Sequence, residues 1–504
     1  MDITPSSTRC NSRRGFIDPI MALALIAMFM GASFMWAFSA EAGTGKPGTK
    51  RFKEWQAAHY PQGPRDATAV QALAEALSLY KSLERKLFNT YPIDEAPPDW
   101  PRGTVFPFDF DALMLDGAPE VVRSRTTSFL DELEDAGLAR ALDQVPDAVP
   151  FVFPPLENFG TPAGVVPLGH IRQISRYNTG RFAIALDSRD EMEMVRVFNS
   201  SVSLARTVAG HPTMIARLVA VANMARSTSE LRTALVELTF SPESLATCQR
   251  LLDQHASWPP LEIYLANLRA DSEDLIHNCY SDDTSGNGRL VLTSLPIQSV
   301  IPDAIEIPSW MSGVSETRFV NILGFKYPTK GETLVRLEVM LATLATYGET
   351  SASARRESHD SPEFTPIDEQ RYPILAITNS AAIRFIQEDA EIQTIVAGTR
   401  LMLAIERFRA TRNEPPKSLD DLAPDFIAQV PIDPWTGTRF GYKLLSTPDE
   451  HGREYILYSY GSNLIDDGGV YNQHFQNFSE SKTDRNSKYD FIFNTPRLVY
   501  ASPE

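Results

Sequence analysis

The sequence predicts an α+β protein with an N-terminal transmembrane helix, a mainly α-helical body (a bundle or stacked helical hairpins), and a C-terminal helix that packs on a small antiparallel β-sheet. Three observations support this: an uncharged apolar run, helical periodicity through the middle of the chain, and alternating strand-like segments near its end. They divide the 504 residues into five segments, at 1–42, 43–66, 67–160, 161–390 and 391–504.

The apolar run covers residues 20–40 and contains no charged side chain. As a helix that rises about 1.5 Å per residue, it is roughly 31 Å long, which is enough to cross the hydrocarbon core of a bilayer. Arg9, Arg13 and Arg14 precede it. Long domains are exported largely regardless of flanking charge, so we expect a membrane-anchored body that faces the periplasm or the exterior.

Two processing signals compete with a retained anchor. Residues 12–17, SRRGFI, resemble a twin-arginine export motif, with a small-residue cleavage site at residues 40–42. Gly15 and Phe16 also resemble a prepilin junction, where a peptidase cuts directly ahead of an apolar helix. The apolar run exceeds the roughly 7 to 15 residues of a secretory signal, which favours retention and leaves cleavage open.

Composition and motifs exclude several classes of ligand. The net charge of −17 comes without a basic segment, which argues against nucleic acid. Residues 43–50 have the glycine spacing of a phosphate loop, but Thr49 and Lys50 stand in reversed order and no strand precedes them, so no nucleotide site is expected. Whether Cys248 and Cys279 form a disulfide stays open.

The body is predicted to consist of helices with short breaks. Residues 67–90 carry one apolar stripe, and residues 169–280 alternate helical segments with breakers, including a break expected at Ser227, Thr228 and Ser229. Short loops between such helices favour antiparallel neighbours.

A first, weak calcium loop follows these helices. Asp283, Ser285 and Asn287 occupy positions 1, 3 and 5 of an EF-hand-type loop. Position 12 is Ser294, where a bidentate carboxylate is needed, so calcium would bind weakly there. A glycine-rich and asparagine-rich turn explains the same residues.

The C-terminal segment is the most specific part of the sequence. A helix with Leu401, Ile405 and Phe408 on one side is followed by prolines, the sequence DPWTG at residues 433–437, and the strand-like YILYSYG at residues 455–461. An acidic, glycine-rich loop comes next.

This order resembles the globular domain of the major pseudopilins of type II secretion, in which a helix packs on a small antiparallel sheet and an acidic loop binds calcium. The resemblance implies that Asp466 and Asp467 are calcium ligands, with Asp484 or Asp490 as candidates to complete the site. A solvated acidic loop is the alternative. The whole chain is also similar to a type of membrane-anchored bacterial envelope protein with no established activity, which implies architecture only.

No HExxH, GxSxG or CxxC motif occurs. We therefore expect a non-catalytic envelope protein, whose helical body contacts other envelope proteins and whose tail is stabilised by calcium. One alternative is a component associated with type II secretion or a pilus-like assembly, although about 350 residues separate the apolar run from the tail. A second is an exported hydrolase that uses carboxylates drawn from Asp109, Asp111, Asp187 and Asp190.

Overall fold

The computed structural model describes residues 67–90, 108–145, 168–210, 213–255, 258–281, 288–291, 321–351, 367–368, 371–461, 464–471 and 489–500. Several predicted features lie outside these residues: the transmembrane run at 20–40, the tether at 43–66, and Asp283, Ser285, Asn287 and Asp484. None of the helices that the structure describes combines the length and the apolar character that a membrane span requires.

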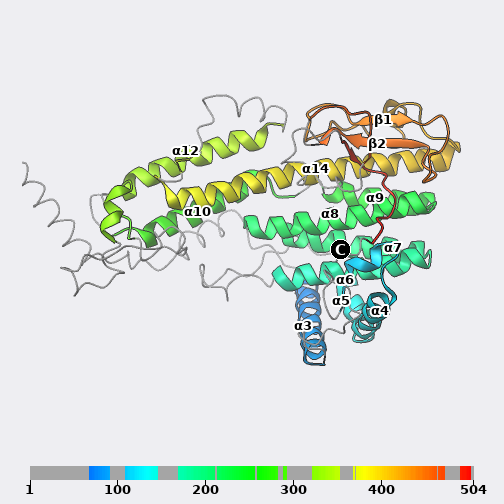
Figure 1. The fold of residues 1–504 in the computed structure, drawn as a ribbon, viewed down its shortest axis with the longest axis horizontal. Helices are drawn as coiled ribbons and strands as arrows, with labels where there is room; N and C mark the ends of the chain where they lie inside the picture. The colour runs from blue at the N-terminus through cyan, green and yellow to red at the C-terminus, as the bar shows by residue number, and fades with distance from the viewer. Residues whose placement is uncertain are drawn as a thin grey trace, which may run out of the picture. The chain divides into compact units, whose positions relative to one another are not determined.

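The described residues are mostly helical, with one small antiparallel sheet, which confirms the α+β class (Figure 1). The α-helices are α3 (Ala67–Thr90), α4 (Glu120–Asp135), α5 (Leu138–Asp143), α6 (Leu168–Asp187), α7 (Glu191–Ala209), α8 (Met214–Glu237), α9 (Pro242–His255), α10 (Leu261–Cys279), α12 (Lys330–Glu349) and α14 (Pro373–Arg412). The 3-10 helices are η2 (Asp111–Met114), η7 (Asn321–Lys326) and η8 (Leu419–Leu422). The strands are β1 (Gly441–Leu444), β2 (Tyr455–Ser459) and β3 (Phe491–Ile492).

The chain forms two compact units. Of the described residues, the smaller unit contains those within 273–336 and 368–375, and the larger unit contains the others. In the smaller unit, Tyr280 is buried and pairs with Leu290 in an antiparallel bridge, and its hydroxyl lies 2.8 Å from Thr333 Oγ1. This bridge and hydrogen bond connect the end of α10 to the first turn of α12.

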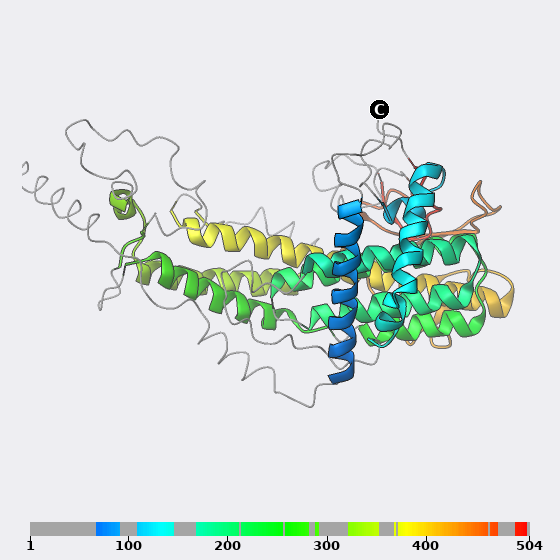
Figure 2. The same cartoon turned by 90° about the horizontal axis from the view of Figure 1, so that it is seen from below.

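In the larger unit, helices α6, α7 and α8 lie side by side (Figures 1 and 2). Asp190 caps α7 by accepting from the backbone N–H of Glu193, and Thr213 caps α8 by accepting from that of Ala216. These caps stand at the helix starts because a short side-chain oxygen can satisfy an amide that has no partner within the helix.

Helix α8 runs through the predicted break at Ser227, Thr228 and Ser229, so that prediction was wrong. Ser227 Oγ and Thr228 Oγ1 donate to the carbonyl of Met224, at 3.2 and 2.7 Å. Both side chains are buried. Their hydroxyls are therefore satisfied within the helix and do not compete with its backbone hydrogen bonds.

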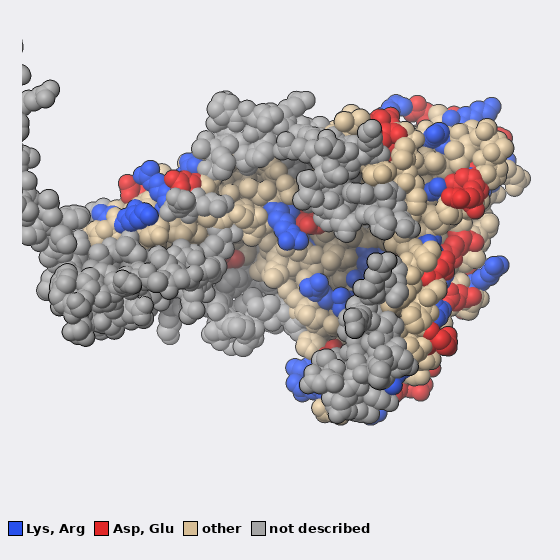
Figure 3. Space-filling model, in the orientation of Figure 1, with Lys and Arg blue, Asp and Glu red and all other residues tan. Residues whose placement is uncertain are grey.

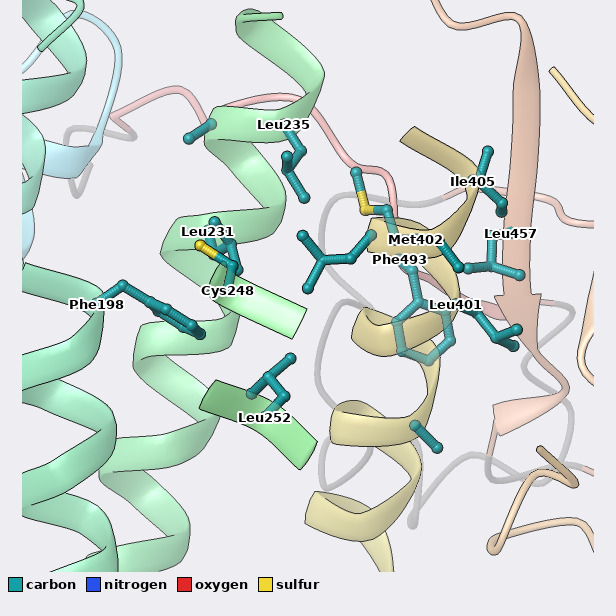
Figure 4. Close-up of a cluster of buried hydrophobic side chains, with 14 of the residues drawn as sticks. Phe198, Leu231, Leu235, Cys248, Leu252, Leu401, Met402, Ile405, Leu457 and Phe493 are labelled. Atoms are coloured by element: carbon teal, nitrogen blue, oxygen red, sulfur yellow. The ribbon is translucent and has the colours of Figure 1, made fainter. Parts of the chain in front are cut away.

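Helix α14 is covered on two sides. Its five consecutive residues 401–405 are all buried, which a helix of 3.6 residues per turn allows only when neighbours surround it. Figure 4 shows Leu231 and Leu252 from α8 and α9 on one side of α14, and Leu457 of β2 on the other. The predicted apolar stripe was therefore too narrow, and α14 also continues across the boundary proposed at residue 390.

The sheet has the order β1-β2-β3, and both pairings are antiparallel. Gly441 pairs with Tyr458, and Ser459 pairs with Phe491. The segment after β3 packs closely on α14, because a Cβ at Gly398 would stand 2.2 Å from the ring of Phe493. On the face shown in Figure 3, acidic and basic side chains are interspersed along the edge that this unit presents at the right.

We predict that Leu401→Ala lowers the free energy of unfolding by about 2–5 kcal/mol, because Leu401 is fully buried between the two layers that cover α14. Leu444→Ala is the matched control, since this side chain is 44% exposed and its loss should cost less than about 0.5 kcal/mol. Denaturant unfolding of both variants measures the difference. Equal effects would show that the core of this unit does not pass through α14.

Candidate functional site

The turn at residues 433–437 joins the sheet to α14. Asp433 is 1% exposed and accepts four hydrogen bonds, from Thr394 Oγ1 (3.0 Å), Trp435 N (2.8 Å), Thr436 Oγ1 (3.1 Å) and Ser459 Oγ (2.6 Å). The indole N–H of Trp435 donates to the carbonyl of Gly461 at 2.8 Å. One buried carboxylate thus connects α14, the turn and the end of β2, and so positions the acidic loop that follows.

The acidic loop, residues 464–471, donates backbone amides to Asp490. Asp490 is 1% exposed and directly precedes β3. Asp490 Oδ2 accepts from the N–H of Gly469 at 2.7 Å, and Oδ1 accepts from that of Asp467 at 3.4 Å. Gly468 and Gly469 have φ values of +80° and +74°, a left-handed conformation that glycine adopts without strain. These two glycines let the loop turn its amides towards the buried carboxylate.

Asp466 lies on the exposed side of the same loop. Its Oδ1 accepts from the hydroxyl of Tyr458 at 3.0 Å and from the N–H of Gly468 at 2.9 Å. Burial is the largest cause that raises the pKa of Tyr458, and the hydrogen bond to Asp466 raises it as well.

The loop concentrates negative charge. The pKa of Asp490 is raised to about 6. Burial is the largest cause, the amide hydrogen bonds from Gly469 and Asp467 oppose it, and the charges of Asp467 and Asp466 add to it. Within the described residues, neither Asp466 nor Asp490 forms a salt bridge. Carboxylates in this arrangement offer oxygen ligands to a hard cation such as calcium.

The structure brings together three of the predicted ligands: Asp466 and Asp467 of the acidic loop, and Asp490, which accepts amides of that loop. The part of the chain that is described holds no group of three or more Asp, Glu, His or Cys side chains arranged around a common metal position. The described carboxylates alone therefore do not complete a metal site, and the fourth candidate, Asp484, lies outside the described residues.

The aspartates considered for a hydrolase have structural partners. Asp190 caps α7, and Asp109 Oδ1 accepts from the N–H of Asp111 at 3.1 Å. Asp111 forms salt bridges with Arg176 and Arg226, and Asp187 with Arg123 and Arg497. Cys248 and Cys279 are buried thiols that no disulfide joins.

Asp433 is the residue of this site that sequence reasoning missed. A signal for it exists, because Asp before Pro and followed by Thr-Gly is typical of a turn in which the aspartate accepts from the backbone two residues on. Here Trp435 N makes that hydrogen bond.

Asp433→Ala is expected to lower the free energy of unfolding by about 2–4 kcal/mol, because it leaves four buried donors without their acceptor. Asp425→Ala, at an exposed aspartate of the same module, is the control and should change stability by less than about 0.5 kcal/mol. Chemical denaturation compares the two. A loss no larger than the control's would mean that the turn is held without Asp433.

No family model matches this chain, and comparison with curated proteins and with solved structures finds no significant match either. Its function must therefore be inferred from its own residues.

Proposed function

We propose that this chain is a membrane-anchored, non-catalytic protein of the bacterial cell envelope, whose helical body contacts other envelope proteins and whose C-terminal module is stabilised by calcium. One observation carries the proposal: α14 packs on a three-stranded antiparallel sheet, and the loop after β2 that contains Asp466 and Asp467 donates two backbone amides to Asp490, directly before β3. This is the arrangement expected from the resemblance to pseudopilin globular domains. The anchor rests on the apolar run at residues 20–40.

Calcium fits the charge of the loop. The carboxyl of Asp490 is buried beside two other aspartates, and its raised pKa reflects the free energy needed to ionise it there. A bound cation would lower that free energy and hold the loop to β3. Asp466, Asp467, Asp490 and Asp484 are the residues that would supply its oxygen ligands.

An interaction protein is favoured over a filament subunit by the burial of α14. In a pseudopilin, the apolar helix runs directly into the globular domain and stacks into a filament. Here residues 401–405 of α14 are covered by helices of the same chain on one side and by the sheet on the other. This part of the helix therefore has no apolar face left for a neighbouring subunit.

The alternative, a component associated with type II secretion or a pilus-like assembly, is distinguished by the N-terminus of the mature protein. We expect mass spectrometry of the membrane-extracted protein to find residues 20–40 retained and no cut at Gly15. A mature chain that begins at Phe16 would instead support processing by a prepilin peptidase.

The calcium proposal is tested by thermal unfolding of the full chain in mild detergent, with calcium and with a chelator. A cation that binds only the folded state stabilises it by RT ln(1 + [L]/Kd), about 2.7 kcal/mol at a hundredfold excess over Kd. We expect calcium to raise the Tm, and Asp466→Ala/Asp467→Ala to abolish the shift.

The matched control is Asp425→Ala/Glu450→Ala, which removes the same charge from exposed positions of the same module and should keep the shift. Magnesium is the second control, because it demands a tighter octahedral geometry and should act more weakly. An equal calcium shift in both double variants, or none in the wild type, would leave the acidic loop as ordinary surface.

A further inference from the structure

A cavity of about 380 Å³ lies in the larger unit, and no residue of the acidic loop lines it. Its walls come from η2, α6 and α8, and from the C-terminal segment at residues 491–498. Figure 1 shows this segment, in red, leaving the sheet and crossing α8 towards α6 and α7. The volume of this cavity is in the range of small-molecule binding sites.

The C-terminal segment is held firmly over the cavity. Backbone hydrogen bonds join Asp116 N to the carbonyl of Leu498 at 2.9 Å, and Tyr500 N to the carbonyl of Asp116 at 2.7 Å. Arg497 adds salt bridges to Asp187 at 2.8 Å and to Glu237 at 3.1 Å. These contacts fix the position of the C-terminal segment, and with it one wall of the cavity.

Arg232 reaches the cavity from α8 and is 6% exposed. Its Nη1 donates to Thr399 Oγ1 at 3.1 Å, and its guanidinium lies 5.7 and 5.6 Å from the ring centroids of Phe491 and Phe493. The buried Nε has no hydrogen-bond partner. Burial lowers the pKa of Arg232 to about 9, which still leaves the group charged at neutral pH.

Arg232 differs from the other arginines that are buried in the described residues. Arg181 forms a salt bridge with Glu193 at 2.7 Å, and Arg217 hydrogen-bonds to Asp389 through Nε at 2.8 Å. Among the described residues, no carboxylate lies within salt-bridge distance of Arg232. A buried charge without a counter-ion is costly, and an anion in the cavity would remove that cost.

Glu230 lies on the same helix as Arg232, two residues before it. It does not neutralise Arg232, because side chains two residues apart on a helix do not face each other. It is 5% exposed, and its Oε1 accepts from Thr179 Oγ1 at 2.5 Å. Burial raises the pKa of Glu230 to about 7. Glu230 is thus partly protonated at neutral pH and can donate a hydrogen bond into the cavity.

We propose that this cavity binds a small organic monocarboxylate with an apolar body, whose carboxylate hydrogen-bonds to the guanidinium of Arg232. A planar guanidinium matches a carboxylate in geometry. The apolar walls, including Met114, Phe491 and Leu498, match an aliphatic or aromatic body. Arg226 also lines the cavity, but it forms a salt bridge with Asp111, so Arg232 is the cation of the lining that has no carboxylate partner among the described residues.

The test measures binding to the full chain by ligand-observed NMR. The probes are hexanoate and 3-phenylpropionate, each paired with its neutral amide. We expect each acid to bind at least tenfold more tightly than its amide, since charge-assisted hydrogen bonds carry the difference. Arg232→Met should remove this preference and leave binding of the amides unchanged.

Two further variants separate binding from folding. Arg384→Met makes the same substitution at an exposed arginine of α14 and should keep the preference for the acids. Ala222→Trp enlarges an exposed residue of the cavity wall, so it should block all four probes without disturbing the core, even if Arg232→Met fails to fold.

Three results would overturn the proposal. The first is that neither acid binds the wild type at 10 mM, roughly the weakest affinity of interest for a small ligand. The second is that acids and amides bind equally, or that Arg232→Met keeps the preference. The third is displacement of hexanoate by an equal concentration of inorganic phosphate, which would assign the cavity to phosphate.

Discussion

The burial of α14 on two sides is the constraint on which the larger unit depends. A helix that is apolar on one face needs one partner, whereas residues 401–405 of α14 need partners all round. Helices α8 and α9 supply one layer and β2 with Phe493 supplies the other. Because the two layers share the same helix, the sheet and the helical body form one hydrophobic core.

Polar contacts fix how α14 sits against its helical layer. Arg217 on α8 hydrogen-bonds to Asp389 at 2.8 Å and stacks 3.9 Å from the ring centroid of Trp258. Arg400 pairs with Asp253 of α9 at 2.5 Å, and Arg407 donates to Gln249 of the same helix at 2.6 Å. Apolar packing tolerates sliding of one helix along another, but a largely buried charge pair such as Arg217 and Asp389 has one register in which its desolvation cost is offset.

The strand β3 and its neighbours connect the two sites. Asp490 accepts hydrogen bonds from the backbone amides of the acidic loop. The next residue, Phe491, lies beside the guanidinium of Arg232 and lines the cavity. Successive side chains in extended backbone point to opposite sides, so one short segment faces both sites. A cation that orders the loop would also hold one wall of the carboxylate cavity.

The sequence by itself determined the features that depend on near neighbours. Helical periodicity and the strand-like YILYSYG are local, and each corresponds to an element of the structure. Tertiary structure decided the rest. Burial of Ser227 and Thr228 kept α8 continuous, and β2 occupied the second side of α14. Asp433 accepts hydrogen bonds from side chains of α14 and β2, which are distant in the sequence. Arg232 is enclosed by segments far apart in the chain, and none of them places a described carboxylate within salt-bridge distance. Desolvation and pairing of this kind are set by which distant segments meet, and no local pattern of residues records that.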